Sequence, residues 1–112
     1  MDEITKCINA LLAAVKDSEE YRTYKKQEEI LSRNPELWQR VDQFRSNNFK
    51  LQNEAYRDEL FSVVEQLSRE SKELRRIPEV NAFLDAELAL CKLLQRICRS
   101  LTEGIDMHVP EL

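Results

Sequence analysis

Glycine occurs only once in the 112 residues of this chain, and proline occurs three times. A single glycine leaves no room for a glycine-rich phosphate-binding loop or for the Gly-x-Ser-x-Gly turn of a hydrolase nucleophile. Leucine, glutamate, lysine, arginine, alanine and glutamine dominate the remainder, and these residues favour long helices over sheets connected by turns. The sequence therefore predicts an all-α fold, with four to five antiparallel helices in a small bundle.

The chain also lacks a long apolar run, an even set of cysteines and an excess of positive charge. No stretch approaches the roughly 18 residues of a membrane span, and the acidic opening Met1-Asp2-Glu3 differs from a signal peptide. Three cysteines, an odd number, indicate reduced thiols rather than a disulfide framework. A net charge of -4 gives no global positive field to hold a polyanion. We expect a cytoplasmic protein with no membrane partner, and direct nucleic-acid binding is disfavoured.

Apolar residues recur at three- and four-residue spacing along most of the chain, which predicts a series of amphipathic helices. Asp17 is the candidate N-cap of the second helix, and Asn34 precedes a proline at the start of the third. We predict a single helical domain over residues 1–104 and a short C-terminal tail over residues 105–112. The predicted helices cover about 3–16, 18–32, 35 to a break near Asn53 to Tyr56, 57–74, and 78–103.

The segment 78–103 is the most apolar part of the chain, and its apolar side chains cover far more than the ~100° stripe of a surface helix. It must therefore be buried on more than one side, and one small domain offers little partner surface. We predict that the chain forms a dimer or higher homo-oligomer through its long helices. The predicted interface residues are Trp38, Val41 and Phe44 in the third helix and Leu90, Leu93, Leu94 and Ile97 in the fifth.

Glu87 stands in the middle of this apolar helix, on the same line as Leu84 and Leu94. A carboxylate in such a place must be paired or must reach solvent. We predict a buried ion pair that fixes the register of the helix, and the alternative is a catalytic acid in a pocket between chains. The candidate partners of Glu87 are Arg33, Arg40 and Arg76.

Few residues suggest a site for chemistry. His108, the only histidine, lies in the predicted tail, where a solvated side chain is expected. Cys91 and Cys98 are seven residues apart and share one helix face, which makes them weak candidates for metal or cluster ligands. Packing as small core residues is the favoured interpretation of these cysteines. No residue is predicted to be catalytic or to bind a cofactor, and we predict that the protein is not an enzyme.

Two charged regions suit an exposed surface that recognises a partner. The second helix has a thin apolar stripe, and a basic cluster precedes Pro78. This cluster allows two interpretations, namely contact with RNA or an acidic protein, or a solvated helix end that complements the helix dipole. The predicted partner-recognising residues are Tyr21, Tyr24, Lys25, Arg69, Lys72, Arg75 and Arg76.

Several short motifs follow one another along the chain, namely Ser18-x-Glu20-Tyr21-x-x-Tyr24, Leu31-x-x-Asn34-Pro35-Glu36-Leu37, Phe44, Leu51-Gln52, and Pro78-Glu79-Val80 leading to Phe83-Leu84-x-Ala86-Glu87. In this order and spacing they resemble the YlbF/YmcA family of small helical bacterial regulators. The resemblance covers nearly the whole chain, from the first helix to Gly104.

This resemblance implies an all-α, non-enzymatic and commonly oligomeric protein from a cytosolic Gram-positive setting. Some family members act in a complex that influences competence, sporulation and biofilm formation and assists an endoribonuclease in maturing messenger RNA. That complex is associated with iron–sulfur clusters held by cysteines. This chain lacks a cysteine-rich C-terminal tail and has Ile77 where the family usually has asparagine. We therefore expect no cofactor here, with an iron–sulfur cluster as the alternative that the resemblance implies, and the resemblance also extends to a paralogous branch with no assigned role.

The leading functional hypothesis is a non-enzymatic regulatory or adaptor protein that acts through protein–protein interaction. Its expected partners are further copies of itself, paralogous family members or an RNA-processing complex. The alternatives are a small all-α enzyme with an inter-subunit site around Glu87 and an RNA-contacting accessory factor.

Overall fold

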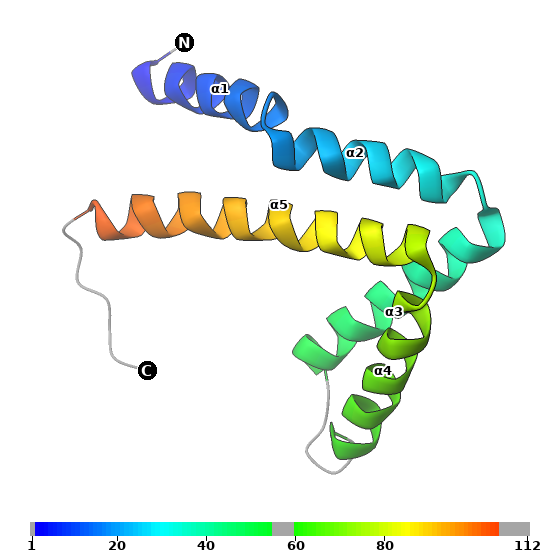
Figure 1. The fold of residues 1–112 in the computed structure, drawn as a ribbon. Helices are drawn as coiled ribbons and strands as arrows, with labels where there is room; N and C mark the ends of the chain where they lie inside the picture. Colours follow the sequence, from blue (N-terminus) through cyan, green and yellow to red (C-terminus); the bar gives the residue numbers. More distant parts are fainter. Residues whose placement is uncertain (1, 55–59, 106–112) are drawn as a thin grey trace.

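The computed structural model of the chain describes residues 2–54 and 60–105, and for residues 51–54, 60, 61 and 63 it describes the backbone only. Within these ranges the chain forms five helices and no strand, which confirms the all-α small bundle. The helix α2 lies antiparallel along α5, and α3 and α4 form a hairpin at the start of α5 (Figure 1). The helices are α1 (Glu3–Lys16), α2 (Glu19–Ser32), α3 (Pro35–Glu54), α4 (Leu60–Arg75) and α5 (Pro78–Glu103).

The helix boundaries follow local capping chemistry at most of the predicted places. The backbone N–H of Leu37 donates a hydrogen bond to Asn34 Oδ1 at 3.2 Å, so Asn34 caps α3 as predicted. Pro78 occupies the first turn of α5, where its missing N–H has no helical acceptor to lose. Gly104 is the C-cap of α5 with φ of -79°, a helical value that other residues also adopt.

Some predictions fall on residues outside the described ranges. The helix α3 is described as far as Glu54 and α4 from Leu60, so the predicted break near Asn53 to Tyr56 falls mostly on residues 55–59, which lie outside the description. Residues 106–112, with His108 and most of the predicted tail, are also outside it. Among the helices that are described, none has the length and apolar content needed to cross a membrane.

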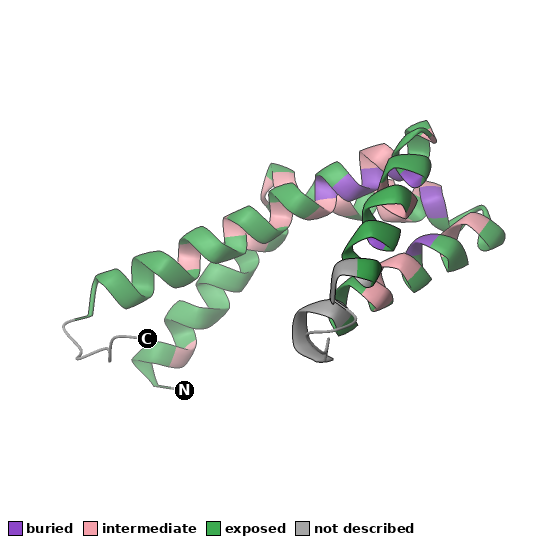
Figure 2. Cartoon of the chain, turned by 90° about the horizontal axis from the view of Figure 1, so that it is seen from below, coloured by how far each residue is buried: buried purple, intermediate pink, exposed green. Residues whose placement is uncertain are grey.

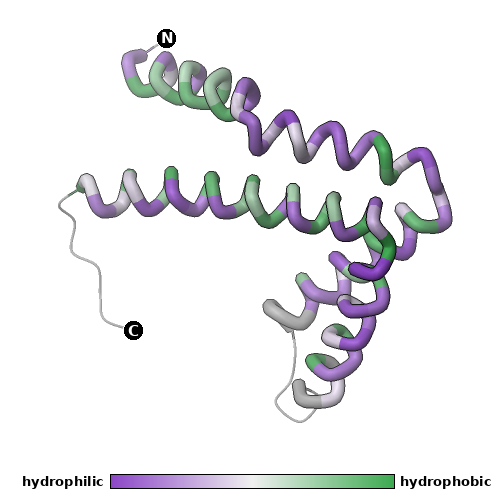
Figure 3. Tube along the Cα trace, in the orientation of Figure 1, coloured by the Kyte–Doolittle hydropathy of each residue, from purple (hydrophilic) through white to green (hydrophobic). Residues whose placement is uncertain are grey.

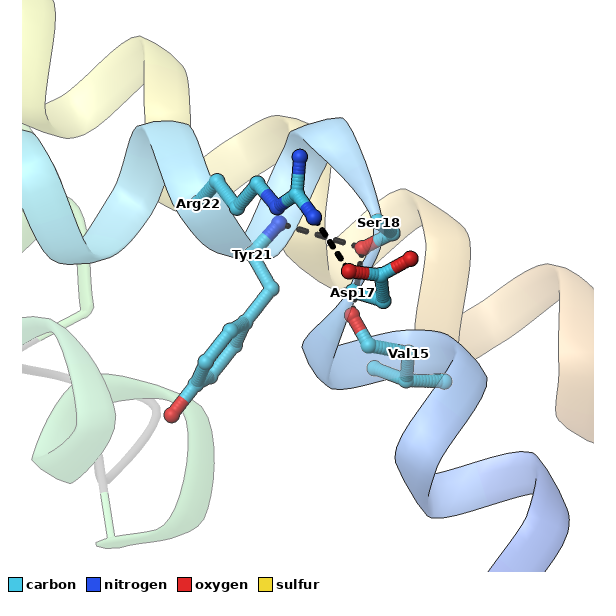
Figure 4. A network of polar contacts seen from close by, with 5 residues as sticks. All are labelled: Val15, Asp17, Ser18, Tyr21 and Arg22. Atoms are coloured by element: carbon cyan, nitrogen blue, oxygen red, sulfur yellow. Dashed lines mark hydrogen bonds and ion pairs between the residues drawn. The ribbon is translucent and has the colours of Figure 1, made fainter.

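The joint between α1 and α2 corrects one predicted cap. The N-cap of α2 is Ser18, not Asp17, because Ser18 has the extended backbone (ψ 154°) that a cap needs, whereas Asp17 is still helical. The N–H of Tyr21 donates to Ser18 Oγ at 3.2 Å, and the Ser18 hydroxyl donates to the Val15 carbonyl oxygen at 2.5 Å (Figure 4). Asp17 instead forms an ion pair with Arg22 across the joint.

The core lies where α2, α3, α4 and α5 meet. Phe83 of α5 is at its centre, fully buried, with the rings of Tyr24 and Trp38 each 5.5 Å away between centroids. The buried residues gather at this end of the molecule, and α1 contributes none of them (Figure 2). The core cluster consists of Leu31, Val41, Leu74, Val80, Phe83 and Leu84.

The chain is more extended than a compact domain of its size. Its radius of gyration is 17.8 Å, compared with about 13 Å for a compact domain of this length. Its accessible surface is 9349 Å², compared with about 6,500 Å² for a compact monomer of this mass. Hydrophobic residues on α1 and on the second half of α5, away from the core, remain exposed (Figure 3).

Phe83→Ala is expected to lower the free energy of unfolding by about 3–5 kcal/mol, because it leaves a cavity between Tyr24 and Trp38. Urea denaturation followed by circular dichroism measures this loss. Leu88→Ala on the same helix is the matched control and is expected to cost under about 0.5 kcal/mol, because Leu88 is exposed. Equal losses in the two variants would contradict the location of the core.

Candidate interaction surface

The helix α5 has two halves with different surroundings. In the first half, residues 78–87, Val80, Phe83, Leu84 and Ala86 are buried. After Ala86 no described residue of α5 is buried. The second half therefore leaves the core while keeping an apolar sequence. We call a line of exposed residues at three- and four-residue spacing the α5 seam, and it consists of Cys91, Leu94, Cys98 and Leu101 in α5 and of Ile105 just after its end.

A second uncovered surface lies on α1. Four large apolar residues at helical spacing are between 40% and 71% exposed, although the same spacing usually marks a side that faces a core. Such a patch on a single chain is typical of a site of contact with another molecule. We call this surface the α1 face, and it consists of Ile4, Ile8, Leu11 and Leu12.

Glu87 is held at the edge of the core by Arg45, which is not among its predicted partners. Its Oε2 lies 2.7 Å from Arg45 Nε, and the two side chains are 27% and 34% exposed. The guanidinium carbon of Arg45 also lies 5.4 Å from the centroid of the Phe83 ring, a cation–π contact. Glu87 is thus a paired carboxylate at a partly solvated edge, not a fully buried one.

The predicted partners of Glu87 were wrong. Arg33 pairs with Glu29 on its own helix, and Arg40 lies near Glu73 of α4. The signal for Arg45 was present in the sequence, because it follows Trp38 by seven residues and therefore lies on the same side of α3. Since Trp38 packs on Phe83, that side faces α5.

The predicted oligomer residues fall into three groups. Val41 is fully buried in the core, so its side chain is not available to a second chain and its predicted interface role is wrong. Trp38 and Phe44 are partly buried against the same core. In α5, Leu94 is exposed, whereas Leu90, Leu93 and Ile97 are partly buried. Leu101 and the α1 face were not among the predicted interface residues, because periodicity marks an apolar side of a helix without showing what covers it.

The predicted partner-recognising residues of α2 take part in contacts within the chain. Tyr21 is partly buried, and the Tyr24 ring packs on Phe83. Lys25 Nζ donates to Glu28 Oε1 at 2.7 Å, and this hydrogen bond raises the pKa of Lys25. This part of α2 therefore has less free surface than its sequence indicates.

The basic cluster before α5 is partly neutralised by neighbouring acids. Arg75 Nη1 donates to Asp85 Oδ1 at 2.9 Å and to Asn81 Oδ1 at 2.8 Å, which fastens the end of α4 to α5. Lys72 and Arg76 are exposed. Arg69 lies in a polar hollow between α3 and α4 together with Arg40 and with Glu65, Glu70 and Glu73.

The cysteines of one chain do not fit an iron–sulfur cluster. Such clusters are usually held by four thiolates at one place, and this chain has three cysteines. Cys91 and Cys98 are exposed thiols separated by about 10 Å along the axis of α5, because an α-helix rises about 1.5 Å per residue. Cys7 is an exposed thiol on α1. The described part of the chain contains no group of three or more His, Cys, Asp or Glu side chains able to hold a metal ion.

Fold and surface together define an all-α bundle protein with a core at one end and a large uncovered apolar surface. A family model described as "Control of competence regulator ComK, YlbF/YmcA" matches residues 4–106. The chain therefore belongs to the YlbF/YmcA family, which confirms the resemblance in its motifs and supports a regulatory role.

The chain is also similar in sequence to a known protein. The chain is 24% identical over 98 residues to a "UPF0342 protein" of Caldicellulosiruptor bescii, a match that covers 86% of this chain and 82% of that protein. No solved structure matches the chain significantly.

Glu87→Gln is expected to lower the free energy of unfolding by about 1 kcal/mol or less, because the ion pair with Arg45 is partly exposed. A double-mutant cycle with Arg45→Gln, read by urea denaturation, measures the coupling. Glu73→Gln is the matched control and should show no coupling to Arg40, since that pair is 3.7 Å apart and more exposed. A Glu87→Gln protein of unchanged stability that had lost a catalytic activity would support the enzyme alternative.

Tyr24 should lose its proton at higher pH than an exposed tyrosine. Burial of its ring against the core raises the pKa of Tyr24 above 10.0, and the nearby Arg45 guanidinium opposes this rise only partly. The neutral phenol is favoured in the fold, so its stabilising contribution is complete below pH 10 and is lost as the pH rises through the folded-state pKa. Ultraviolet titration of tyrosinate should show a late component that is missing in Tyr24→Phe. Loss of an early component of the titration in Tyr24→Phe, with the late component kept, would contradict the burial.

Proposed function

We propose that this protein is a non-enzymatic regulatory adaptor that acts by binding other proteins through exposed helical surfaces. The observation that carries the proposal is the α1 face. Four large apolar side chains on one helix stay uncovered, although their spacing is that of a helix side that packs in a core. Burying apolar surface contributes about 25 cal/mol per Å², so such a helix is stabilised when a partner covers it.

The position of α1 suits it to reach a partner. It meets the rest of the chain at the joint with α2, where Ser18 and the Asp17–Arg22 pair define the turn (Figure 4). No described residue of α1 is buried in the core. The helix can therefore engage another protein without any loss of core packing in its own chain.

Family membership supports the regulatory part of the proposal, because the family description refers to control of the competence regulator ComK. The partners we propose are further copies of the chain, paralogous family members and components of an RNA-processing complex. The iron–sulfur clusters of such a complex would need ligands from other chains, since the three cysteines here do not fit one cluster.

Ile8→Glu in the α1 face tests the proposal. Tagged chains are expressed in the native cell, and the captured proteins are compared between wild type and variant. We expect Ile8→Glu to lose at least about nine-tenths of the specifically captured protein, because a buried charge would cost several kcal/mol in the interface. Circular dichroism should show unchanged helix content, since Ile8 is exposed in the chain.

Ala13→Glu is the matched control on the same helix. Ala13 lies on the opposite side of α1 from Ile4, nine residues away and half a turn out of phase. It should capture the same proteins as wild type. Identical capture by Ile8→Glu and wild type would contradict a role for the α1 face.

A further inference from the structure

The side of α5 that packs on α2 continues as an apolar line through the second half of α5. Phe83 marks this side, because its ring lies 5.5 Å from the ring of Tyr24 between centroids. Apolar residues follow Phe83 at a spacing of seven, which keeps them on the same side of the helix, and two leucines alternate with them. We call these residues the α5 inner line, and they are Leu90, Leu94, Ile97 and Leu101. Leu94 and Leu101 also belong to the α5 seam.

The helix α1 carries an apolar line with the same spacing. In both lines the residues follow one another at intervals of four, three and four, which is the 3.5-residue repeat along which two helices pack over their whole length. The line on α1 extends the α1 face as far as the joint with α2. It consists of Ile4, Ile8, Leu11 and Val15.

The packing of α2 on α5 sets the register in which the two lines would meet. The two helices run antiparallel, with Tyr24 opposite Phe83 (Figure 1). Nine residues before Tyr24 the chain reaches Val15, and seven residues after Phe83 it reaches Leu90. The bend at Ser18, which leaves the helical conformation, takes up the difference. In this register the remaining pairs are Leu11 with Leu94, Ile8 with Ile97, and Ile4 with Leu101.

Burial along α1 decreases with distance from the joint. Val15 is partly buried, and the exposed fraction then rises from 40% at Leu11 to 71% at Ile4. The α5 inner line is partly buried at its start and 58% exposed at its last residue, Leu101. The two helices diverge from the joint toward their free ends (Figure 1). Two matching apolar lines thus lie on helices that are close at one end and open at the other.

The joint between α1 and α2 has the features of a hinge. Asp17 keeps a helical backbone and only Ser18 is extended, so a single residue interrupts the helix. The ion pair between Asp17 and Arg22 spans this joint on the surface (Figure 4). Exposed ion pairs contribute little to stability, and no described residue of α1 is buried in the core. A change of angle at Ser18 therefore leaves the core intact.

Neither line contains a charged residue. Lys6 lies about half a turn away from the line on α1, and Lys92 and Arg99 lie about half a turn away from the α5 inner line. If the two lines came together, these cations would stay in water and only apolar side chains would lose their solvent.

We infer that α1 also adopts a closed position, in which the α1 face packs on the α5 inner line of the same chain. This inference rests on the proposed function, because the closed position hides the α1 face from a protein partner. The partner binds only the open position seen in Figure 1, so its apparent affinity is reduced by the fraction of chains that are open. The chain thus contains its own competitor for the partner.

An engineered disulfide tests the closed position. The three native thiols are exposed and are first removed by Cys7→Ser, Cys91→Ser and Cys98→Ser. Ile8→Cys and Ile97→Cys are then added, since facing residues of packed helices bring their Cα atoms into the range of about 4.4–6.8 Å that a disulfide spans. After mild oxidation with copper phenanthroline at low micromolar concentration, we expect a disulfide within one chain. A faster band on a non-reducing gel measures it.

The matched control combines Ile8→Cys with Gln95→Cys in the same background. Gln95 is exposed and lies two residues before Ile97, about 160° away around the helix. The disulfide with Ile97→Cys should form at least about tenfold faster than the control, because closure holds its two thiols at a high effective concentration. Equal rates would overturn the closed position. A disulfide that forms only between two chains would also overturn it.

Protein capture tests whether closure hides the α1 face. The tagged, oxidised chain with Ile8→Cys and Ile97→Cys is incubated with an extract of the native cell, before and after reduction of its disulfide. We expect the oxidised form to capture at least about tenfold less protein than the reduced form, because its α1 face is held against α5. Ile97→Cys alone is the control and should capture equally in both states. Equal capture by the locked and the reduced chain would overturn the competition.

The two proposals can fail separately. If no disulfide forms within one chain while Ile8→Glu still loses the captured protein, the closed position is overturned and the adaptor role stands. If the disulfide forms within one chain while Ile8→Glu captures the same proteins as wild type, the adaptor role is contradicted and the closed position is supported.

Discussion

The packing of Phe83 is the contact on which the arrangement of the helices depends. One ring from α5 is enclosed by Tyr24 of α2 and Trp38 of α3, while the Arg45 guanidinium lies over it. Burying a phenylalanine fully contributes about 2–3 kcal/mol, and here that burial joins three helices at one point. Arg45 then reaches Glu87, so the only carboxylate on the apolar line of α5 is neutralised where the core ends.

The core lies at one end of the molecule, and this position has a direct consequence for function. Residues around Phe83 are buried or partly buried, whereas α1 and the second half of α5 keep apolar surfaces that the chain itself does not cover (Figures 2 and 3). The fold thus separates the part that holds the chain together from the parts that meet partners. In our proposal, the α1 face recognises other proteins, which fits a family described by regulation.

Local sequence signals were sufficient to predict the helices, but not to predict which residues of other helices pack against them. The starts at Pro35 and Pro78 were predicted because proline and its flanking residues restrict the backbone without help from the rest of the chain. The cap at Ser18 was missed by one residue, since both Asp17 and Ser18 have suitable side chains and only the backbone conformation distinguishes them. The pairing of Glu87 with Arg45 was missed because it depends on how α3 crosses α5.

The sequence by itself determined the all-α fold, the order and approximate extent of the helices, the apolar line of α5 and the family. All of these depend on residue preferences, on spacing within one helix or on the order of short motifs. Only the tertiary structure decided that Val41 is buried, that α1 contributes nothing to the core and that the same line of α5 is covered before Glu87 and open after Cys91. Helical periodicity fixes which side chains share a side of a helix, but the neighbour that covers them is set by contacts between residues far apart in the chain.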